Sequence, residues 1–265
     1  MTKENLTTNE GKLAQTLFAA YSEQKPLQMT DYSDVLSNDE SAYRVQSYLT
    51  SLKQEPIGGY KVSLTSAETQ ALFAADAPLY GAQISSHFVE SPHTFLRTEL
   101  MDPLAEVELM ITAKEDLSSA DSPAELLEKT TVAPAIEVPD SRFSDWFPSL
   151  PKHLVMADAA VGGYVVYGKE QDSSTVFATP DDVAAVHCQL FHNDKRLKDG
   201  AATEVLDNPL NSLHWLVAKL EEQGLGLTSG QRVSSGTFLL PENLTVGNWR
   251  AEFDSGLSDV SLDVK

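Results

Sequence analysis

Two glutamates, Glu106 and Glu108, alternate with apolar residues in the segment 103–111. Successive strand side chains point to opposite faces, so a strand here places Val107 and Leu109 on one face and both carboxylates on the other. Two carboxylates this close repel each other, which favours a proton on one of them or a cation between them. An isolated E-x-E motif more often marks the solvent-facing side of an edge strand, and that alternative stays open here.

A third carboxylate, Glu137, lies in a similar apolar segment at 132–138. Three oxygen ligands on rigid strands suit a hard divalent ion such as Mg²⁺ or Mn²⁺, with coordination positions left for water or substrate. The sequence therefore contains a candidate metal centre made of Glu106, Glu108 and Glu137.

The N-terminal part has the pattern of amphipathic helices. Thr7 followed by Glu10 is a capping-box pattern, and Ser37 followed by Glu40 is a second one. Apolar residues at helical spacing follow each of them. Further helix starts are predicted at Thr65, at Ser122-Pro123 and at Asn208-Pro209.

Strands are predicted through much of the remaining chain. Alternating or apolar runs indicate strands at 56–62, 183–191, 231–240 and 260–264, and 77–81 has the composition of a turn. Many strands interrupted by short helices predict an α+β fold with a large mixed sheet or barrel. A soft boundary near residue 80 separates a helical N-terminal part, 1–80, from a β-rich part, 81–265, and we expect the two to form one continuous domain.

Composition excludes several classes of function. The chain has 265 residues, with 39 acidic against 19 basic side chains and a net charge of −20. This charge repels polyanions, so nucleic acid and anionic membrane surfaces are not expected partners. A single cysteine allows no internal disulfide. The sequence has no signal-peptide pattern and no membrane-spanning apolar run, which predicts a cytoplasmic protein. P-loop, zinc-protease and nucleophile-elbow motifs are also missing from it.

Several short motifs occur together along the chain: Gly59-Tyr60-Lys61, the E-x-E strand, Pro134-Ala135-Ile136-Glu137, Ser141-Arg142 with Asp145-Trp146, and Ser235-Gly236. This combination resembles the fumarylacetoacetate hydrolase superfamily. Within it, the chain is similar to the 2-hydroxypenta-2,4-dienoate (2-keto-4-pentenoate) hydratases and the 4-oxalocrotonate decarboxylases. The resemblance covers nearly the whole chain.

The resemblance implies a fold and a set of site residues. The fold would be the family's β-rich barrel, of the fumarylacetoacetase C-terminal type, with peripheral helices and assembly into a homo-oligomer. Glu106, Glu108 and Glu137 would bind the metal ion, and Lys61 would be the ionisable group beside the substrate, with its pKa lowered by the nearby cation. Taken alone, Lys61 would be read as a strand lysine in contact with solvent. The implied substrate-binding residues are Ser141, Arg142, Asp158, Ser235 and Thr237.

The implied function is that of a metal-dependent lyase in aromatic catabolism, hydrating a 2-hydroxy-2,4-dienoate to a 4-hydroxy-2-oxo acid. Decarboxylation of a 2-oxo acid or C–C hydrolysis is the alternative within the superfamily. A non-catalytic protein that binds a 2-oxo acid is a further alternative, because apolar residues stand where these hydratases commonly have polar ones. These positions are Leu79, Leu104, Ala159 and Val161.

Overall fold

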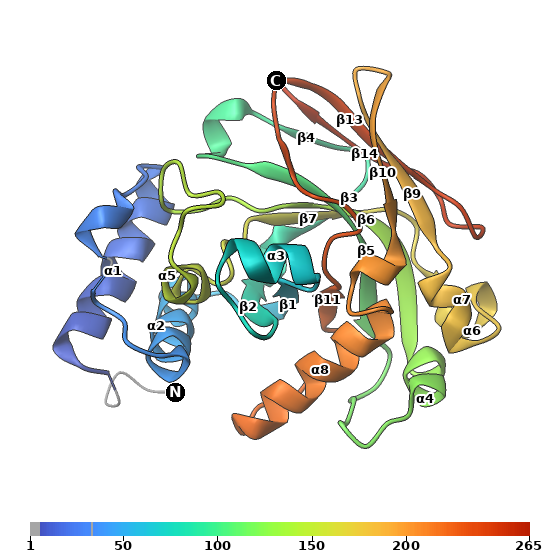
Figure 1. Ribbon diagram of the computed structural model, residues 1–265, viewed down its shortest axis with the longest axis horizontal. Helices are drawn as coiled ribbons and strands as arrows, with labels where there is room; N and C mark the ends of the chain where they lie inside the picture. Colours follow the sequence, from blue (N-terminus) through green and yellow to red (C-terminus); the bar gives the residue numbers. More distant parts are fainter. Residues whose placement is uncertain (1–5, 33) are drawn as a thin grey trace.

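The computed structural model describes residues 6–32 and 34–265, and a nine-stranded sheet forms its centre (Figure 1). Its strands are β1 (Ile57–Ser63), β2 (Leu79–Ile84), β3 (Phe88–Glu90), β5 (Leu104–Ala113), β6 (Thr130–Val138), β7 (Tyr164–Tyr167), β8 (Gln171–Asp172), β11 (Arg232–Ser234) and β12 (Glu242–Asn243). Their order is β2-β1-β11-β5-β6-β7-β3, with β12 on β5 and β8 on β6. Parallel and antiparallel pairs occur together, so the sheet is mixed.

A second, five-stranded sheet lies above the first in Figure 1. It is formed by β4 (His93–Phe95), β9 (His187–His192), β10 (Lys195–Ala201), β13 (Gly247–Phe253) and β14 (Val260–Val264), in the order β10-β9-β13-β14-β4. The prediction of an α+β fold built on a large mixed sheet with peripheral helices is confirmed.

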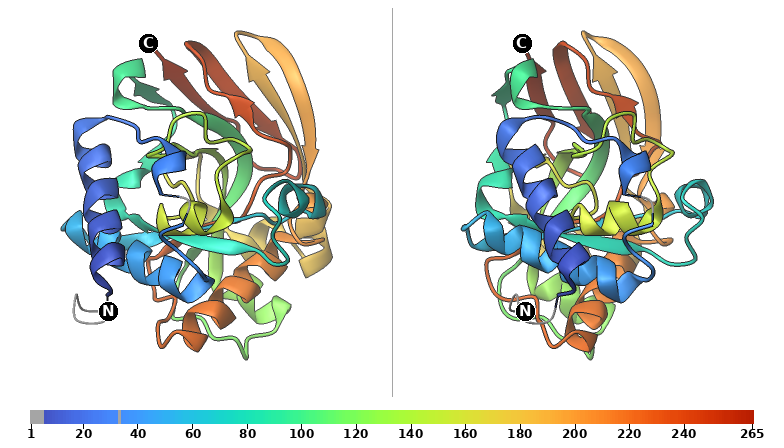
Figure 2. Two further views of the ribbon diagram at one scale, coloured as in Figure 1. Left: turned by 60° about the vertical axis from the view of Figure 1, so that its left-hand side comes forward. Right: turned by 90° about the vertical axis from the view of Figure 1, so that its left-hand side faces the viewer.

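Two long N-terminal helices pack side by side at one end of the molecule (Figure 2). Helix α1 (Thr8–Glu23) begins at the predicted capping box of Thr7 with Glu10. Helix α2 (Asp39–Leu52) begins one residue later than predicted. Its N-cap is Asn38, whose side chain accepts a hydrogen bond from the Ser41 amide. Asn caps a helix at least as well as Ser, so the neighbouring Asn38 takes the place of Ser37.

The remaining helices are short except for one. The predicted starts at Ser122 and Asn208 are confirmed as caps of α4 and α8, while α3 is capped by Ser66 and not by Thr65. These helices are α3 (Ala67–Leu72), α4 (Pro123–Glu128), α5 (Lys152–Ala157), α6 (Ser173–Val176), α7 (Pro180–Ala184) and α8 (Pro209–Glu222). Single 3₁₀ turns are η2 (Met29–Asp31), η3 (Ser85–His87), η4 (Arg97–Glu99) and η5 (Ala202–Glu204).

Three of the predicted boundaries are wrong. The strand predicted at 183–191 starts only at His187, because Val183 lies in α7. The segment 77–81 is not a turn, because β2 starts at Leu79 and pairs with β1 along its whole length. The segment 231–240 is not one strand, because the chain leaves the sheet after Ser234 and Gly236 has a positive φ of 111°. Strands β1 and β2 pair across the expected boundary near residue 80, and the division of the chain there stays a prediction.

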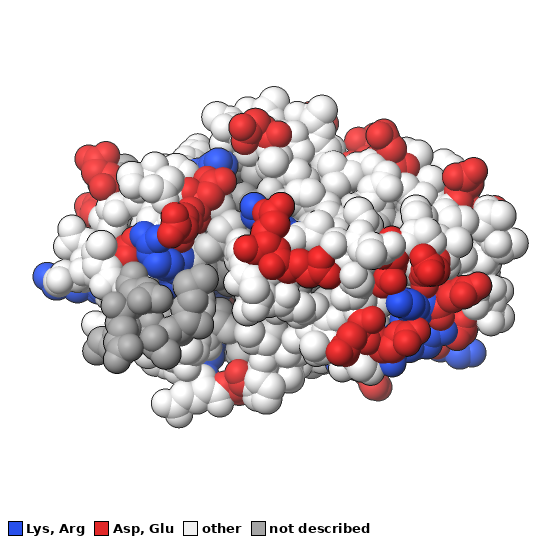
Figure 3. Space-filling model, turned by 90° about the horizontal axis from the view of Figure 1, so that it is seen from below, with Lys and Arg blue, Asp and Glu red and all other residues white. Residues whose placement is uncertain are grey.

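Acidic side chains are spread over the face seen from below in Figure 3, and basic side chains lie in small groups beside them. This distribution is the expected outcome of a net charge of −20. Across the described ranges, no helix is both long enough and apolar enough to cross a membrane.

Candidate metal centre

The three glutamates predicted as metal ligands lie together on the central strands β5 and β6. Glu106 of β5 lies directly opposite Glu137 of β6, and Glu108 follows two residues along β5 on the same face. One ligand oxygen from each carboxylate lies within 4.8 Å of the others. Strand β5 is flanked by β6 and β11, and Glu108 and Glu137 are 0% and 1% exposed. The alternative of a solvent-facing edge strand is therefore wrong.

The hydrogen bonds of these carboxylates leave two buried oxygens free. Glu108 Oε2 accepts hydrogen bonds from the Ser234 hydroxyl and, at 3.0 Å, from the Gly236 amide. Among the described residues, Glu108 Oε1 and Glu137 Oε2 are buried without any hydrogen-bond partner. An unpartnered buried oxygen costs about 1–3 kcal/mol, and more when it is charged. A divalent cation bound by the three carboxylates would satisfy both oxygens, and an all-oxygen donor set suits Mg²⁺, Mn²⁺ or Ca²⁺.

Lys61 of β1 reaches the same cluster. Its side chain is 1% exposed, and its Nζ lies 2.5 Å from Glu137 Oε1. The preceding Gly59 is needed for strand packing, because a Cβ there would come within 1.9 Å of the Arg232 carbonyl oxygen on β11. The alternative of a solvent-exposed strand lysine is wrong, and Lys61 belongs to the candidate site.

The charges in this cluster shift one another's proton affinities. Burial raises the pKa of Glu106 to about 8, of Glu108 to about 7 and of Glu137 to about 8, and repulsion between the carboxylates adds to the rise. Burial lowers the pKa of Lys61, but attraction by the three carboxylates outweighs it and raises the pKa above its ordinary value. The lower pKa expected for Lys61 beside a bound cation stays a prediction. Without an ion, the cluster therefore binds protons at higher pH than free carboxyl groups do.

A narrow cavity of about 30 Å³ leads to the cluster, and both Lys61 and Glu106 line it. Thr237, a predicted substrate-binding residue, lies on the same wall, and its hydroxyl donates to the Leu239 carbonyl at 2.7 Å. Ser235 does not line this cavity, and its carbonyl accepts a hydrogen bond from Ser212.

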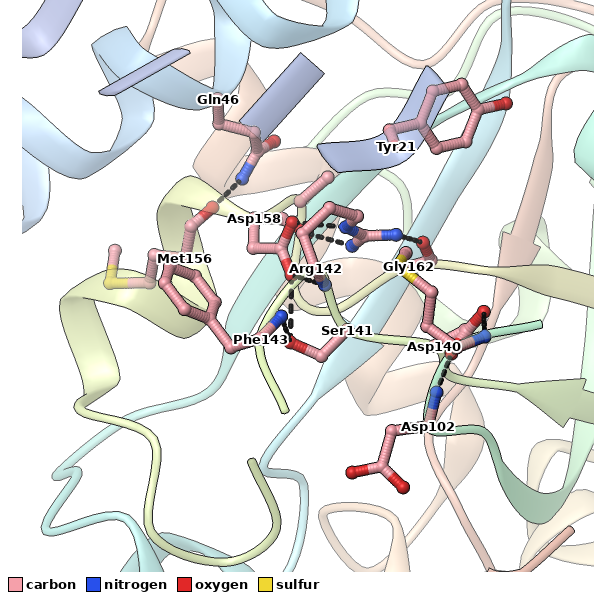
Figure 4. A network of polar contacts seen from close by, with 12 residues as sticks. Tyr21, Gln46, Asp102, Asp140, Ser141, Arg142, Phe143, Met156, Asp158 and Gly162 are labelled. Carbon is pink, nitrogen blue, oxygen red and sulfur yellow. Dashed lines mark hydrogen bonds and ion pairs between the residues drawn. The ribbon is translucent and has the colours of Figure 1, made fainter. Parts of the chain in front are cut away.

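The predicted substrate-binding residues Ser141, Arg142 and Asp158 form a buried network of their own (Figure 4). Arg142 Nε lies 2.5 Å from Asp158 Oδ1, and its terminal nitrogens donate to the carbonyls of Asp158 and Gly162. The Ser141 hydroxyl donates to Asp158 Oδ2 at 3.1 Å. These contacts fix the segment after β6 to the turn after α5. Direct contact with a substrate stays a prediction for these three residues.

Ser234, which orients Glu108, was not among the predicted site residues. It lay inside a segment read as one long strand, where nothing distinguished it from Ser235. The pairing of Ser234 with Met110 of β5 places it beside Glu108, and that pairing is a tertiary feature.

The chain is similar in sequence to hydratases and similar in fold to a solved decarboxylase. The chain is 30% identical over 200 residues to a 2-keto-4-pentenoate hydratase of Burkholderia vietnamiensis, covering 74% of each chain. It is 27% identical over 223 residues to a 2-oxo-hept-4-ene-1,7-dioate hydratase of Escherichia coli, covering 80% of each chain. The fold matches that of a 4-oxalocrotonate decarboxylase from Pseudomonas putida G7, which was solved in complex with magnesium and adipate. The match has a TM-score of 0.88 and 22% sequence identity, and it covers 98% of this chain and 100% of the decarboxylase. No family model matches the chain.

Substitutions at the cluster should weaken metal binding in a graded way. Glu108→Gln removes a charged ligand and is expected to lower Mn²⁺ affinity by more than about 100-fold. Ser234→Ala removes only the hydrogen bond that orients Glu108, and it is expected to cost about 10- to 100-fold. Calorimetric titration with Mn²⁺ measures both, with the exposed Glu23→Gln as the matched control. Unchanged affinity in Glu108→Gln would remove Glu108 from the site.

The raised pKa values predict how stability depends on pH in the ion-free protein. Between the ordinary carboxyl pKa of 4.5 and about 8, the folded state binds more protons at Glu106 than the unfolded chain does. The stabilisation from this group is therefore present at low pH and is lost as the pH rises to 8. Urea unfolding in EDTA from pH 5 to 8 should show a steeper loss of stability in the wild type than in Glu106→Gln. Parallel curves for the two proteins would contradict the shifted pKa.

Proposed function

The chain belongs to the 2-keto-4-pentenoate hydratase family, and from this we propose that it is a metal-dependent hydro-lyase. It adds water to a 2-hydroxy-2,4-dienoate and produces a 4-hydroxy-2-oxo acid. The observation that carries the proposal is the cluster of three carboxylates, two of them buried, in contact with Lys61, which lines a cavity together with Glu106. In such a cluster, a small acid can meet both a cation and a proton donor.

Glu106, Glu108 and Glu137 would hold one divalent ion, and we propose Mg²⁺ or Mn²⁺ because all three donors are hard oxygens. When bound, such an ion supplies positive charge that stabilises negative charge on substrate oxygens. The Ser234 hydroxyl and the Gly236 amide would keep Glu108 aimed at the ion. The apolar walls of the cavity would exclude bulk water and strengthen these charge interactions.

Lys61 would transfer the proton. Hydration of a 2-hydroxydienoate requires the enol to become a 2-oxo-3-enoate, which gains a proton at C5 and loses the proton of its 2-hydroxyl group. As an ammonium group held by Glu137, Lys61 can give a proton to C5 and regain one from the hydroxyl, and the lower pKa predicted beside a bound cation would ease the first transfer. Water then adds its oxygen at C4 and a proton at C3. Glu137, in contact with Nζ, would hold the ammonium in position between the two transfers.

We further propose, on the resemblance alone, that the protein is a homo-oligomer located in the cytoplasm and acting in aromatic catabolism. Contacts of Ser141, Arg142, Asp158, Ser235 and Thr237 with the substrate remain part of the proposal. For Arg142 and Asp158, the mutual ion pair supports an indirect contribution, through the position of the adjoining turn.

Turnover tests the function directly. The ultraviolet absorbance of 2-hydroxypenta-2,4-dienoate should fall when the protein and Mg²⁺ are added, and NMR should identify 4-hydroxy-2-oxopentanoate as the product. EDTA should abolish the change. A product with one carbon fewer would indicate decarboxylation. Binding without turnover would indicate a protein that only binds 2-oxo acids.

Two substitutions separate proton transfer from charge at Lys61. Lys61→Met keeps most of the stem without the amine, and Lys61→Arg keeps a charge that does not readily deprotonate. If Lys61 transfers a proton, both variants should lose about 100-fold or more in kcat and still bind oxalate in the presence of Mn²⁺. If Lys61 serves only as an anchor, arginine should restore activity and methionine should weaken oxalate binding. Near-normal turnover in Lys61→Met would exclude it from the reaction.

A further inference from the structure

The cavity that leads to the metal centre has two chemically different parts. Lys61 and Glu106 make its polar part, next to the three-carboxylate cluster. Among the described residues that line it, Lys61 is the only basic one, and its ammonium is already engaged with Glu137. The rest of the wall is largely apolar, formed by Leu64, Phe73, Trp146, Phe147, Val155 and Val161.

Aromatic rings make up a large share of the apolar wall. The rings of Phe73 and Phe147 lie 6.0 Å apart, and Phe147 packs edge-on against Trp146 at 5.6 Å. The indole Nε1 of Trp146 donates to the Asp102 carbonyl at 2.9 Å, so its polar group is not available to a ligand. The Thr69 hydroxyl likewise donates to the Ser66 carbonyl.

The position of Val161 on this wall is unusual. It has a φ of 50° and ends a run of three residues in the left-handed region, after Ala159 and Ala160. A β-branched residue in this region is strained, and such strain persists only where surrounding contacts enforce it. The Val161 carbonyl accepts from the Asp140 amide at 2.9 Å, and Gly162 donates to Ala159. The fold therefore holds an apolar side chain at the cavity.

The surroundings of the cavity are acidic. Thr69 and Thr237 also line a neighbouring open cavity that contains Glu68, Asp199 and Glu204. Its one lysine, Lys198, is paired with Glu242 at 2.8 Å.

On the other side, Trp146 and Phe147 also line a surface groove that contains Asp102 and Asp145. The one arginine of that groove, Arg97, donates to two backbone carbonyls. Within the described part of the chain, neither of the two neighbouring pockets presents a lysine or arginine that is free of such partners.

We infer that the site takes acids with a single carboxylate and a short uncharged tail, and that it rejects acids with a second carboxylate on the tail. A second carboxylate would lose its hydration against the largely apolar walls, and the lysine and arginine side chains around it already have other partners. The inference rests on the proposed function. It separates this chain from relatives whose substrates are dicarboxylic acids, and it assigns Phe73, Phe147 and Val161 as the residues that set the preference.

A matched pair of ligands tests the inference without turnover. 2-Oxopentanoate and 2-oxoglutarate have the same five-carbon chain and the same 2-oxo acid end, and they differ only in a terminal methyl or carboxylate group. With the Mn²⁺-loaded protein, calorimetry should show 2-oxopentanoate binding about 30-fold or more tightly. Equal or tighter binding of 2-oxoglutarate would overturn the inference, and so would a lack of 2-oxopentanoate binding at millimolar concentration.

A charge placed at the rim should change the preference. Phe147→Arg puts a guanidinium between the cavity and the surface groove, and it is expected to reduce the preference for 2-oxopentanoate about tenfold. Phe147→Leu removes the ring without adding charge and should keep the preference. A folded Phe147→Arg protein with the wild-type preference would contradict the assignment of Phe147.

Hydration of 2-hydroxypenta-2,4-dienoate, measured separately, tests the proposed function independently of the binding preference. Loss of the proposed function alone would leave the binding preference intact, with no hydration. Failure of the further inference alone would leave hydration intact, with 2-oxoglutarate bound as well as 2-oxopentanoate.

Discussion

The contact between Lys61 and Glu137 is the interaction on which the rest of the site depends. In the sheet order, β11 and β5 lie between the strands that carry these residues. Neighbouring strands are about 4.8 Å apart, so β1 and β6 would be about 14 Å apart in a flat sheet. The sheet must curl for Nζ and Oε1 to meet at 2.5 Å. Once they meet, three carboxylates and one ammonium share a buried site, with two negative charges in excess. Two protons or one divalent cation balance that excess. The curl of the sheet therefore brings the charged groups together and also produces the negative charge that favours cation binding.

The features around the cluster hold it in this geometry. Gly59 allows β1 to approach β11 closely, and the turn at Gly236 brings its amide to Glu108. The Arg142–Asp158 pair is fully enclosed, and its hydrogen bonds join the chain after β6 to the strained turn at Val161 (Figure 4). Breaking one member of such a pair leaves an uncompensated buried charge, which typically costs about 3–5 kcal/mol. The wall of the cavity thus depends on an ion pair that does not line it.

Local signals in the sequence predicted local structure well. The Thr7–Glu10 box, the Ser122-Pro123 start and the parity of Glu106 and Glu108 are set by neighbouring residues, and the structure has each of them. Ser37 failed as a cap only because Asn38 competes with it. The strand at Leu79 was missed because Pro78 and Gly81 have turn composition, while pairing with β1 decides the outcome. Two features could not be predicted from the residues alone. One is the contact that Lys61 makes with Glu137 across the curled sheet, and the other is the ion pair between Arg142 and Asp158. Both require contacts between segments that are distant in the sequence.

The overall charge makes capture of an anionic substrate a local event. A net charge of −20 opposes the approach of any acid, but free charges are screened over about 8 Å at physiological ionic strength. Close to the cavity, the charges within that distance therefore determine whether an acid is attracted or repelled. The surrounding acids repel a carboxylate, whereas the proposed cation and the Lys61 ammonium would attract one. A molecule with charge at one end and an apolar tail at the other satisfies both conditions when its carboxylate enters first. For the proposed substrate, the acidic surroundings would therefore contribute to orientation as well as to selectivity, since an acid that entered tail first would leave its carboxylate among like charges.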